Sequence, residues 1–76
     1  MPEERVKLLI KGVVQGVGFR PFIYQLAQAH NLKGWVLNSS GGVIIEAEGE
    51  KASVEAFLLD IKPKAPPRAV IESIEN

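Results

Sequence analysis

The sequence predicts an α+β domain in which an antiparallel sheet carries two helices on one of its faces. Apolar residues alternate with polar ones in four short stretches and recur at helical spacing in two others. These stretches follow the order strand, helix, strand, strand, helix, strand, without repeats or low-complexity segments between them. Each strand–helix–strand crossover is expected to be right-handed. One sheet covered by one layer of helices is the simplest arrangement that satisfies both crossovers.

The first part of the chain predicts a strand, a glycine-containing loop and a helix. Apolar side chains alternate along one face of Val6–Lys11, which is typical of a half-buried strand. Gly12–Gly18 follows as the loop. Phe22–His30 then carries apolar residues at helical spacing. Pro21 fits the start of this helix, and Asn31 is expected to end it.

A hairpin is predicted in the middle of the chain. Gly34–Asn38 and Val43–Glu48 are both rich in residues that favour strands. Between them, Ser39–Gly42 is a cluster of turn-forming residues. Two strands joined by such a short turn form a β-hairpin.

The last part predicts a helix and a closing strand. Apolar side chains at i, i+3, i+4 and i+7 indicate an amphipathic helix, namely Val54, Phe57, Leu58 and Ile61. Pro63, Pro66 and Pro67 are expected to stop this helix and to stiffen the connection after it. Ala69–Ile74 is the last strand. The whole order is that of a ferredoxin-like βαββαβ sandwich, so we expect one domain over residues 1–76.

The composition narrows the function classes and the compartment. The chain is 46% hydrophobic and has no cysteine, so we expect a folded domain without disulfides, a thiolate nucleophile or a cysteine-based zinc site. Nine basic residues balance nine acidic ones, so the chain has no net positive charge that would attract nucleic acid or an anionic membrane. No apolar run approaches the roughly 20 residues that span a bilayer, and Met1–Glu4 does not begin a secretory signal. We therefore expect a cytoplasmic protein with no nucleic-acid and no membrane partner.

The stretch Val14–Arg20, Val-Gln-Gly-Val-Gly-Phe-Arg, has the properties of a phosphate-binding loop. Its glycines permit the φ values that let backbone amides from Gln15 to Arg20 point inward. The helix that follows directs its partial positive end to the same place, and the Arg20 guanidinium can grip two phosphate oxygens. No lysine followed by Ser or Thr closes the loop, so it is not a Walker loop. Spacing alone favours a plainer alternative, a tight turn with a surface arginine, because a short glycine-containing loop is a weak signal.

Two motifs resemble the signatures of the acylphosphatase family. Val14–Arg20 is similar to that family's pattern V-x-G-V-x-F-R, and Gly34–Asn38 is similar to its pattern G-x-V-x-N. Gly42–Val43 falls where the family's hairpin carries G-x-V. Pro21–Phe22 and Pro66–Ala69 further resemble the acylphosphatase-like N-terminal domain of the carbamoyltransferases of nickel–iron hydrogenase maturation. This second likeness implies further domains of the same polypeptide.

The resemblance implies an enzyme that hydrolyses acyl phosphates, with carbamoyl phosphate as the substrate inside such a carbamoyltransferase. It implies that Arg20 binds the substrate phosphate and that Asn38 orients the attacking water. An acyl phosphate is an activated mixed anhydride that needs positioning and charge stabilisation more than a strong base. We therefore expect no metal and no cofactor. The predicted phosphate-binding loop comprises Gln15, Gly16, Val17, Gly18, Phe19 and Arg20.

Other interpretations carry less weight. A non-catalytic module of the same fold, which binds phosphate or another small molecule as a regulator, stays open. RNA binding would require aromatic residues on the third strand, and Val43–Glu48 has none. Among single residues, we expect His30 on the surface at the end of the first helix. Trp35 and Tyr24 are expected to be core or partly buried residues.

Overall fold

The structure of the chain is a computed structural model that describes residues 3–76. Met1 and Pro2 lie outside the described residues. They belong to the stretch Met1–Glu4, which was used above to predict the compartment. The described residues form β1 (Glu3–Val13), α1 (Phe19–Ala29), β2 (Lys33–Ser39), β3 (Gly42–Glu50), α2 (Lys51–Lys64) and β4 (Val70–Glu75).

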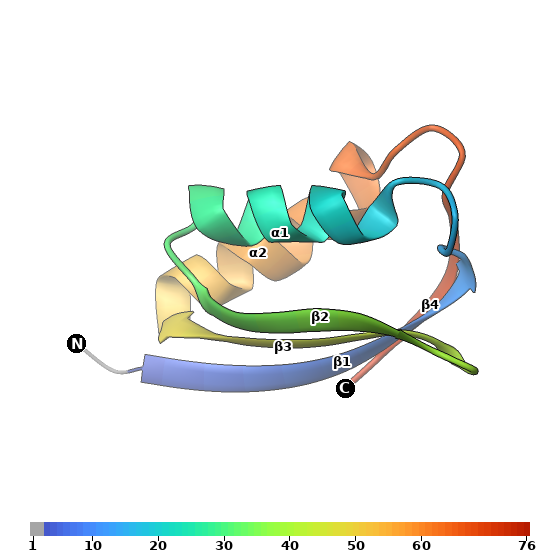
Figure 1. Cartoon of the computed structure of the whole chain (residues 1–76). Coiled ribbons are helices and arrows are strands. Elements are labelled where there is room, and N and C mark those ends of the chain that lie inside the picture. Colours follow the sequence, from blue (N-terminus) through green and yellow to red (C-terminus); the bar gives the residue numbers. More distant parts are fainter. Residues whose placement is uncertain (1–2) are drawn as a thin grey trace.

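The strands form one antiparallel sheet in the order β2-β3-β1-β4. β1 is central, with Ile10 opposite Val43 of β3 and opposite Ile74 of β4. Both helices lie on one face of the sheet, and the other face is open (Figure 1). The predicted fold class is therefore confirmed. The same topology places the β1–α1 loop, the start of α1 and the β2–β3 turn at one end of the molecule (Figure 1).

A single hydrophobic core fills the space between the sheet and the helices. The central strands and both helices contribute to it because one face of each strand and one stripe of each helix is apolar. Its most buried strand and helix residues are Leu8, Ile10, Val43, Ile45, Ala47, Phe19, Ile23, Val54, Phe57 and Ile61. Alternation along β3 is as the sequence predicts.

α1 begins earlier than the sequence predicts. Its N-cap is Gly18, which adopts a left-handed conformation with φ 80° and ψ 17°, and its first residue is Phe19. Pro21 consequently lies within the first turn, where a missing N–H has no intrahelical acceptor to lose. The Phe22 amide donates to the Gly18 carbonyl oxygen at 3.2 Å. At the other end Asn31 has φ 59°, which agrees with its predicted role in ending the helix.

α2 is longer than the sequence predicts. It follows β3 without a loop and runs through Pro63 to Lys64, so the prediction that Pro63 stops the helix is wrong. In the last turn a proline removes only one i→i−4 hydrogen bond, and the complete burial of Phe57 and Ile61 holds the preceding turns against the sheet. Neither helix of residues 3–76 is long and apolar enough to cross a membrane.

Three side chains lie in environments that the sequence does not predict. Trp35 is 44% exposed and Tyr24 is 59% exposed, so neither belongs to the core. His30 is not a free surface residue. Its Nε2 lies 2.9 Å from Oδ2 of Asp60 in α2, and its ring meets Phe57 edge-on. His30 therefore connects the end of α1 to the middle of the second helix.

Candidate active site

The loop between β1 and α1 is anchored by buried side chains at both ends. Val14 and Phe19 are each only 1% exposed. Between them Val17 packs partly buried against the core. The ring of Phe22 lies 5.6 Å from that of Phe19, with a tilt of 53°. The loop is thus fixed at its two ends while its glycines remain at the surface.

The φ angle changes sign between successive residues of this loop, and the loop amides make no hydrogen bond within residues 3–76. Gly16 has φ 72° and Gly18 has φ 80°, whereas Val17 between them does not have a positive φ. Alternation of this kind turns successive N–H groups to one side and forms an anion-binding concavity. From Gln15 through Arg20, no backbone N–H donates to an acceptor within residues 3–76. These donors are therefore available to a ligand.

Arg20 lies in the first turn of α1 with an exposed side chain. It is the only Lys or Arg of that helix. Among the described residues no carboxylate pairs with it, whereas Arg5 on the open face of the sheet is held by Glu46 and Glu48 at 3.2 and 3.6 Å. The guanidinium of Arg20 is consequently free to bind an anion at the helix N-terminus.

Asn38 lies near the end of β2, opposite Val43 of β3. It shares a face of the strand with Val36, which packs against the core, so its side chain leaves the sheet on the side of the helices. Its amide makes no hydrogen bond with the rest of the described chain. This end of β2 and the start of α1 lie at the same end of the molecule (Figure 1). The fold therefore brings Asn38 and Arg20 to one end and one side of the sheet.

Gln15 contributes a side chain that sequence reasoning missed. Its Nε2 donates to the carbonyl oxygen of Ser39 at 2.7 Å and to that of Gly42 at 3.0 Å. The sequence predicts a role only for its backbone amide, as one of the donors to the phosphate. A hydrogen bond to a backbone carbonyl across 24 or 27 residues has no signature in the sequence, because every residue offers such a carbonyl.

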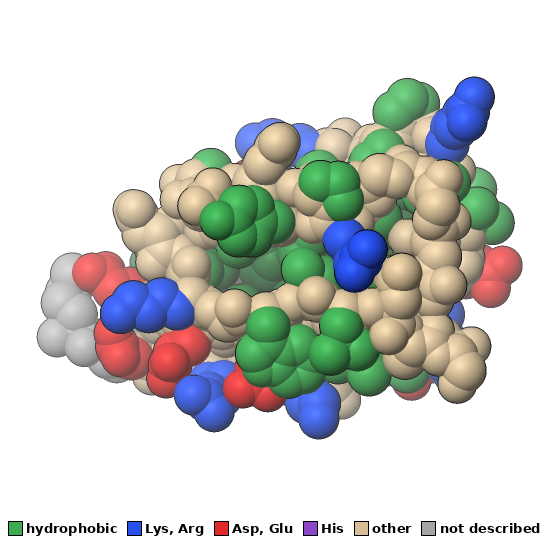
Figure 2. Space-filling view, viewed as in Figure 1, with side chains coloured by type: hydrophobic (Ala, Val, Ile, Leu, Met, Phe, Trp, Pro, Cys, Tyr) green, Lys and Arg blue, Asp and Glu red, His purple; other side chains and the backbone are tan. Residues whose placement is uncertain are grey.

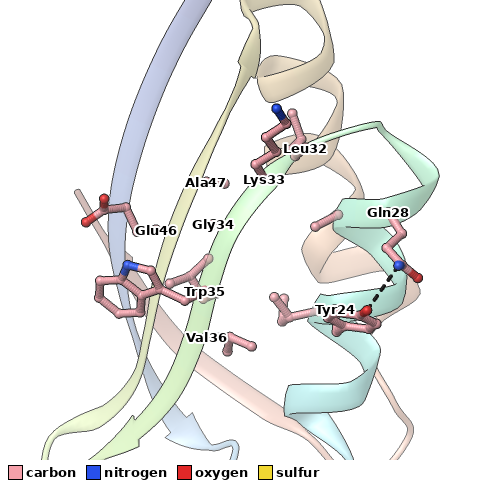
Figure 3. Close-up of a pocket in the computed structure, with 12 residues that line it drawn as sticks. Tyr24, Gln28, Leu32, Lys33, Gly34, Trp35, Val36, Glu46 and Ala47 are labelled. Carbon is pink, nitrogen blue, oxygen red and sulfur yellow. Dashed lines mark hydrogen bonds between the residues drawn. The ribbon is translucent and has the colours of Figure 1, made fainter.

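A groove lies beside the candidate site, between α1 and β2. Its volume is about 340 Å³, and Figure 2 shows it as a hollow with a hydrophobic floor. Tyr24 and Gln28 border it from α1, and Val36 borders it from β2 (Figure 3). Neither Arg20 nor Asn38 lines it. Arg20 and Asn38 are both exposed and thus lie at the molecular surface, outside this groove.

The arrangement as a whole suits a tetrahedral oxyanion. It combines a helix N-terminus with backbone amides and one guanidinium that have no partner among residues 3–76, and these are the groups that hold phosphate in proteins. In the part of the chain that the structure describes, no three His, Cys, Asp or Glu side chains gather as a metal site. Fold and site together define a small α+β domain whose β1–α1 loop has the features of an anion-binding loop.

A sequence model of the acylphosphatase family matches residues 6–76, and the chain belongs to that family. An acylphosphatase of Chlorobaculum tepidum is 38% identical over 76 residues, covering 99% of this chain and 82% of that protein. The crystal structure of an acylphosphatase from Bacillus subtilis matches with a TM-score of 0.87 and 35% identity, over 93% of this chain and 79% of that one. The resemblance seen in the sequence is confirmed, and this membership supports acylphosphatase activity.

Other relatives are much longer proteins. Carbamoyltransferase HypF of Rhizobium leguminosarum bv. viciae is 51% identical over 74 residues, which is 97% of this chain and 10% of that protein. A crystal structure of full-length HypF in the phosphate- and nucleotide-bound form matches with a TM-score of 0.94 and 47% identity, again over 97% of this chain and 10% of that one. The chain thus spans about a tenth of the length of these relatives and is similar to one domain of a larger protein.

Proposed function

We propose that this domain hydrolyses the carboxyl–phosphate bond of acyl phosphates, with the phosphate group held by the loop from Gln15 to Arg20. The observation that carries the proposal is a row of backbone N–H groups that have no acceptor within residues 3–76, next to an arginine that pairs with no carboxylate of those residues. Donors fixed in advance around a phosphoryl group stabilise the charge that its oxygens carry in the transition state. Such an array requires little rearrangement when the substrate binds.

In the proposed reaction a water oxygen attacks phosphorus, and the bond between phosphorus and the acyl oxygen breaks. The leaving group departs as a carboxylate, which is stable without protonation at neutral pH. Asn38 orients the water through its amide. An amide cannot remove a proton, so we assign that role to a phosphate oxygen of the substrate itself. The products are a carboxylate and inorganic phosphate, which together carry the two hydrogens of the water or release one to solvent.

We further propose carbamoyl phosphate as the natural substrate and a hydrogenase-maturation carbamoyltransferase as the longer polypeptide. The support is the similarity to proteins named carbamoyltransferase, at 51% and 45% identity. Hydrolysis would then yield phosphate and carbamate, and the carbamate would serve a second active site in another domain of the same polypeptide. We place this reaction in the cytoplasm, the compartment expected from the sequence.

The enzymatic proposal is tested by following benzoyl phosphate by ultraviolet absorbance and carbamoyl phosphate by phosphate release. We expect turnover by the wild-type chain. Arg20→Ala and Asn38→Ala should each lower kcat/KM by about 10²–10³, the usual effect of removing one preorganised polar group. Ser40→Ala, an exposed change in the β2–β3 turn, is the matched control and should keep full activity. Retention of activity in either of the first two variants would show that its role is wrongly assigned.

The main alternative, a regulatory module that binds phosphate without turnover, gives a different result. In that case the wild-type chain binds inorganic phosphate in a calorimetric titration and leaves both acyl phosphates intact. The predicted outcome is phosphate binding together with turnover, because the same loop performs both.

A further inference from the structure

The side chain of Gln15 joins the phosphate-binding loop to the β2–β3 hairpin. Its NH₂ group has two hydrogens, and each reaches a backbone carbonyl, one of Ser39 and one of Gly42. These two residues face each other in the register of the hairpin. Among the residues described, no other hydrogen bond of a side chain links the loop to the hairpin.

The two carbonyl groups that accept hydrogen bonds from Gln15 are held in place by the sheet. Gly42 has φ 141°, and a Cβ atom there would lie 2.2 Å from the carbonyl oxygen of Ile10 in β1, so the hairpin is pressed against the central strand. The Gly42 carbonyl oxygen also accepts a hydrogen bond from Oγ of Ser39 at 3.3 Å. Gln15 therefore bonds to the paired strand ends of the hairpin and not to its turn residues, Ser40 and Gly41.

The position of the two acceptor carbonyls shows what the hydrogen bonds of Gln15 connect. Ser39 follows Asn38 directly in β2, so Gln15 connects the loop that is proposed to hold the phosphate with the strand that is proposed to hold the water. We infer that Gln15 is a positioning residue, whose side-chain amide sets the loop at a fixed distance from Asn38. This inference rests on the proposed function. In-line attack requires the two reacting atoms to approach to about 3–3.5 Å, and an error of about 1 Å can cost a factor of about 10² in rate.

The direct test is Gln15→Met, which removes both donors without adding charge and keeps an unbranched side chain of similar length. We expect kcat for benzoyl phosphate to fall by roughly 10- to 100-fold. The inhibition constant of inorganic phosphate should change by less than about threefold, since the loop amides and Arg20 remain and the lost alignment matters only in the transition state. This split between kcat and phosphate affinity separates positioning from a general loosening of the loop.

Gln28→Met is the matched control. The amide of Gln28 donates to the hydroxyl of Tyr24 at 3.1 Å within α1, so the same chemical change is made without touching the loop or the hairpin. We expect its kcat and its phosphate inhibition constant to equal those of the wild-type chain.

A double-mutant cycle with Asn38→Ala tests the coupling itself. Without the Asn38 amide there is no oriented water to align, so Gln15→Met should cost less than about threefold in that background. An equal loss in both backgrounds would contradict the inference. So would a Gln15→Met variant with unchanged kcat, or one whose phosphate affinity falls as far as its kcat/KM.

A second variant keeps the inference testable if the first one does not fold. If far-UV circular dichroism shows that Gln15→Met does not fold, Gln15→Asn replaces it. This variant keeps the NH₂ group on a shorter stem that reaches at most one of the two carbonyls, and a wild-type kcat there would overturn the inference.

A wild-type chain without turnover would contradict the proposed function and the inference together, whereas normal wild-type turnover with an unaffected Gln15 variant would contradict the inference alone.

Discussion

Arg20 offers an anion a planar fork of N–H donors that no carboxylate of the described residues occupies. A guanidinium binds two oxygens of one phosphate at once, whereas an ammonium group acts as a single point charge. If Arg20 grips the phosphate as we propose, the geometry of its head group should matter in addition to its charge.

We therefore expect Arg20→Lys to remain folded and to lose part of its activity. The charge is kept and the fork is lost, so kcat/KM for benzoyl phosphate should fall by about tenfold, equivalent to about 1.4 kcal/mol, which is less than the loss in Arg20→Ala. Steady-state kinetics measure the effect. Arg68→Lys, an exposed arginine before β4, serves as the control. Full activity of Arg20→Lys would argue against bidentate binding.

Gly18 supplies the second prediction at the scale of residues. A Cβ atom at Gly18 would meet nothing within 4 Å, so the cost of Gly18→Ala comes from its φ of 80° alone. Such a conformation costs an L-residue about 1–2 kcal/mol. We expect a loss of this size in urea denaturation, together with reduced turnover. Gly41→Ala has equal space and no positive φ, and it should be close to wild type. Equal stability of the two variants would contradict the explanation.

The candidate site residues could be proposed from the sequence to different degrees. Arg20 and Asn38 came from motifs in which one residue type at one spacing carries the chemistry. The Gln15 side chain did not, because its partners are carbonyl groups of the β2–β3 hairpin. Which carbonyls approach it depends on tertiary packing, which local sequence does not encode.

At the scale of elements, α1 and α2 are joined by a small polar cluster. Asp60 of α2 contacts His30 at 2.9 Å and Lys64 at 3.1 Å. The hydrogen bond from His30, followed by that from Lys64, lowers the pKa of Asp60 below its ordinary value of 3.8. A carboxyl group with a lowered pKa in the folded state stabilises the fold above its ordinary pKa and ceases to do so as pH falls through the lowered value.

The cluster should therefore give stability a defined dependence on pH. Asp60→Asn is expected to have a lower urea midpoint than the wild-type chain near neutral pH. The gap should shrink as pH falls below 3.8, because the wild-type carboxylate is then being protonated. Glu55→Gln, on the same helix and outside every ion pair of residues 3–76, controls for the removal of one acidic group. A gap that stays constant with pH would contradict this account.

Periodicity predicted the type and order of every element in the described chain. It did not predict that α2 passes through Pro63, since a proline near a helix end is tolerated when the preceding turns are well packed. Nor did it predict that Trp35 is 44% exposed. Alternation in a strand separates two faces, but it does not say that the helices leave the Trp35 face of β2 open.

At the scale of the whole molecule, one core on one face of a four-stranded sheet supports residues 3–76. The radius of gyration of the Cα atoms is 11.5 Å. A domain of this size buries only about 60% of the surface of its unfolded chain. Its net stability should accordingly be close to the contribution of a few large core side chains.

Phe57→Ala tests this dependence on the core. Phe57 is 0% exposed, and truncating a buried phenylalanine costs about 3–5 kcal/mol. We expect the variant to be largely unfolded by far-UV circular dichroism at 25 °C. Leu59→Ala, two residues further along α2 and 78% exposed, should unfold at nearly the wild-type urea concentration. A cooperative, near wild-type transition for Phe57→Ala would contradict a single shared core.

The most direct test of the phosphate-binding loop is a titration of the ¹⁵N-labelled chain with inorganic phosphate, followed by nuclear magnetic resonance. If the loop amides and Arg20 bind the anion, the amide signals from Gln15 through Arg20 should move most, and Arg20→Ala should abolish these shifts. Shifts confined to the groove between α1 and β2, or loop signals that stay in place at saturating phosphate, would contradict the account.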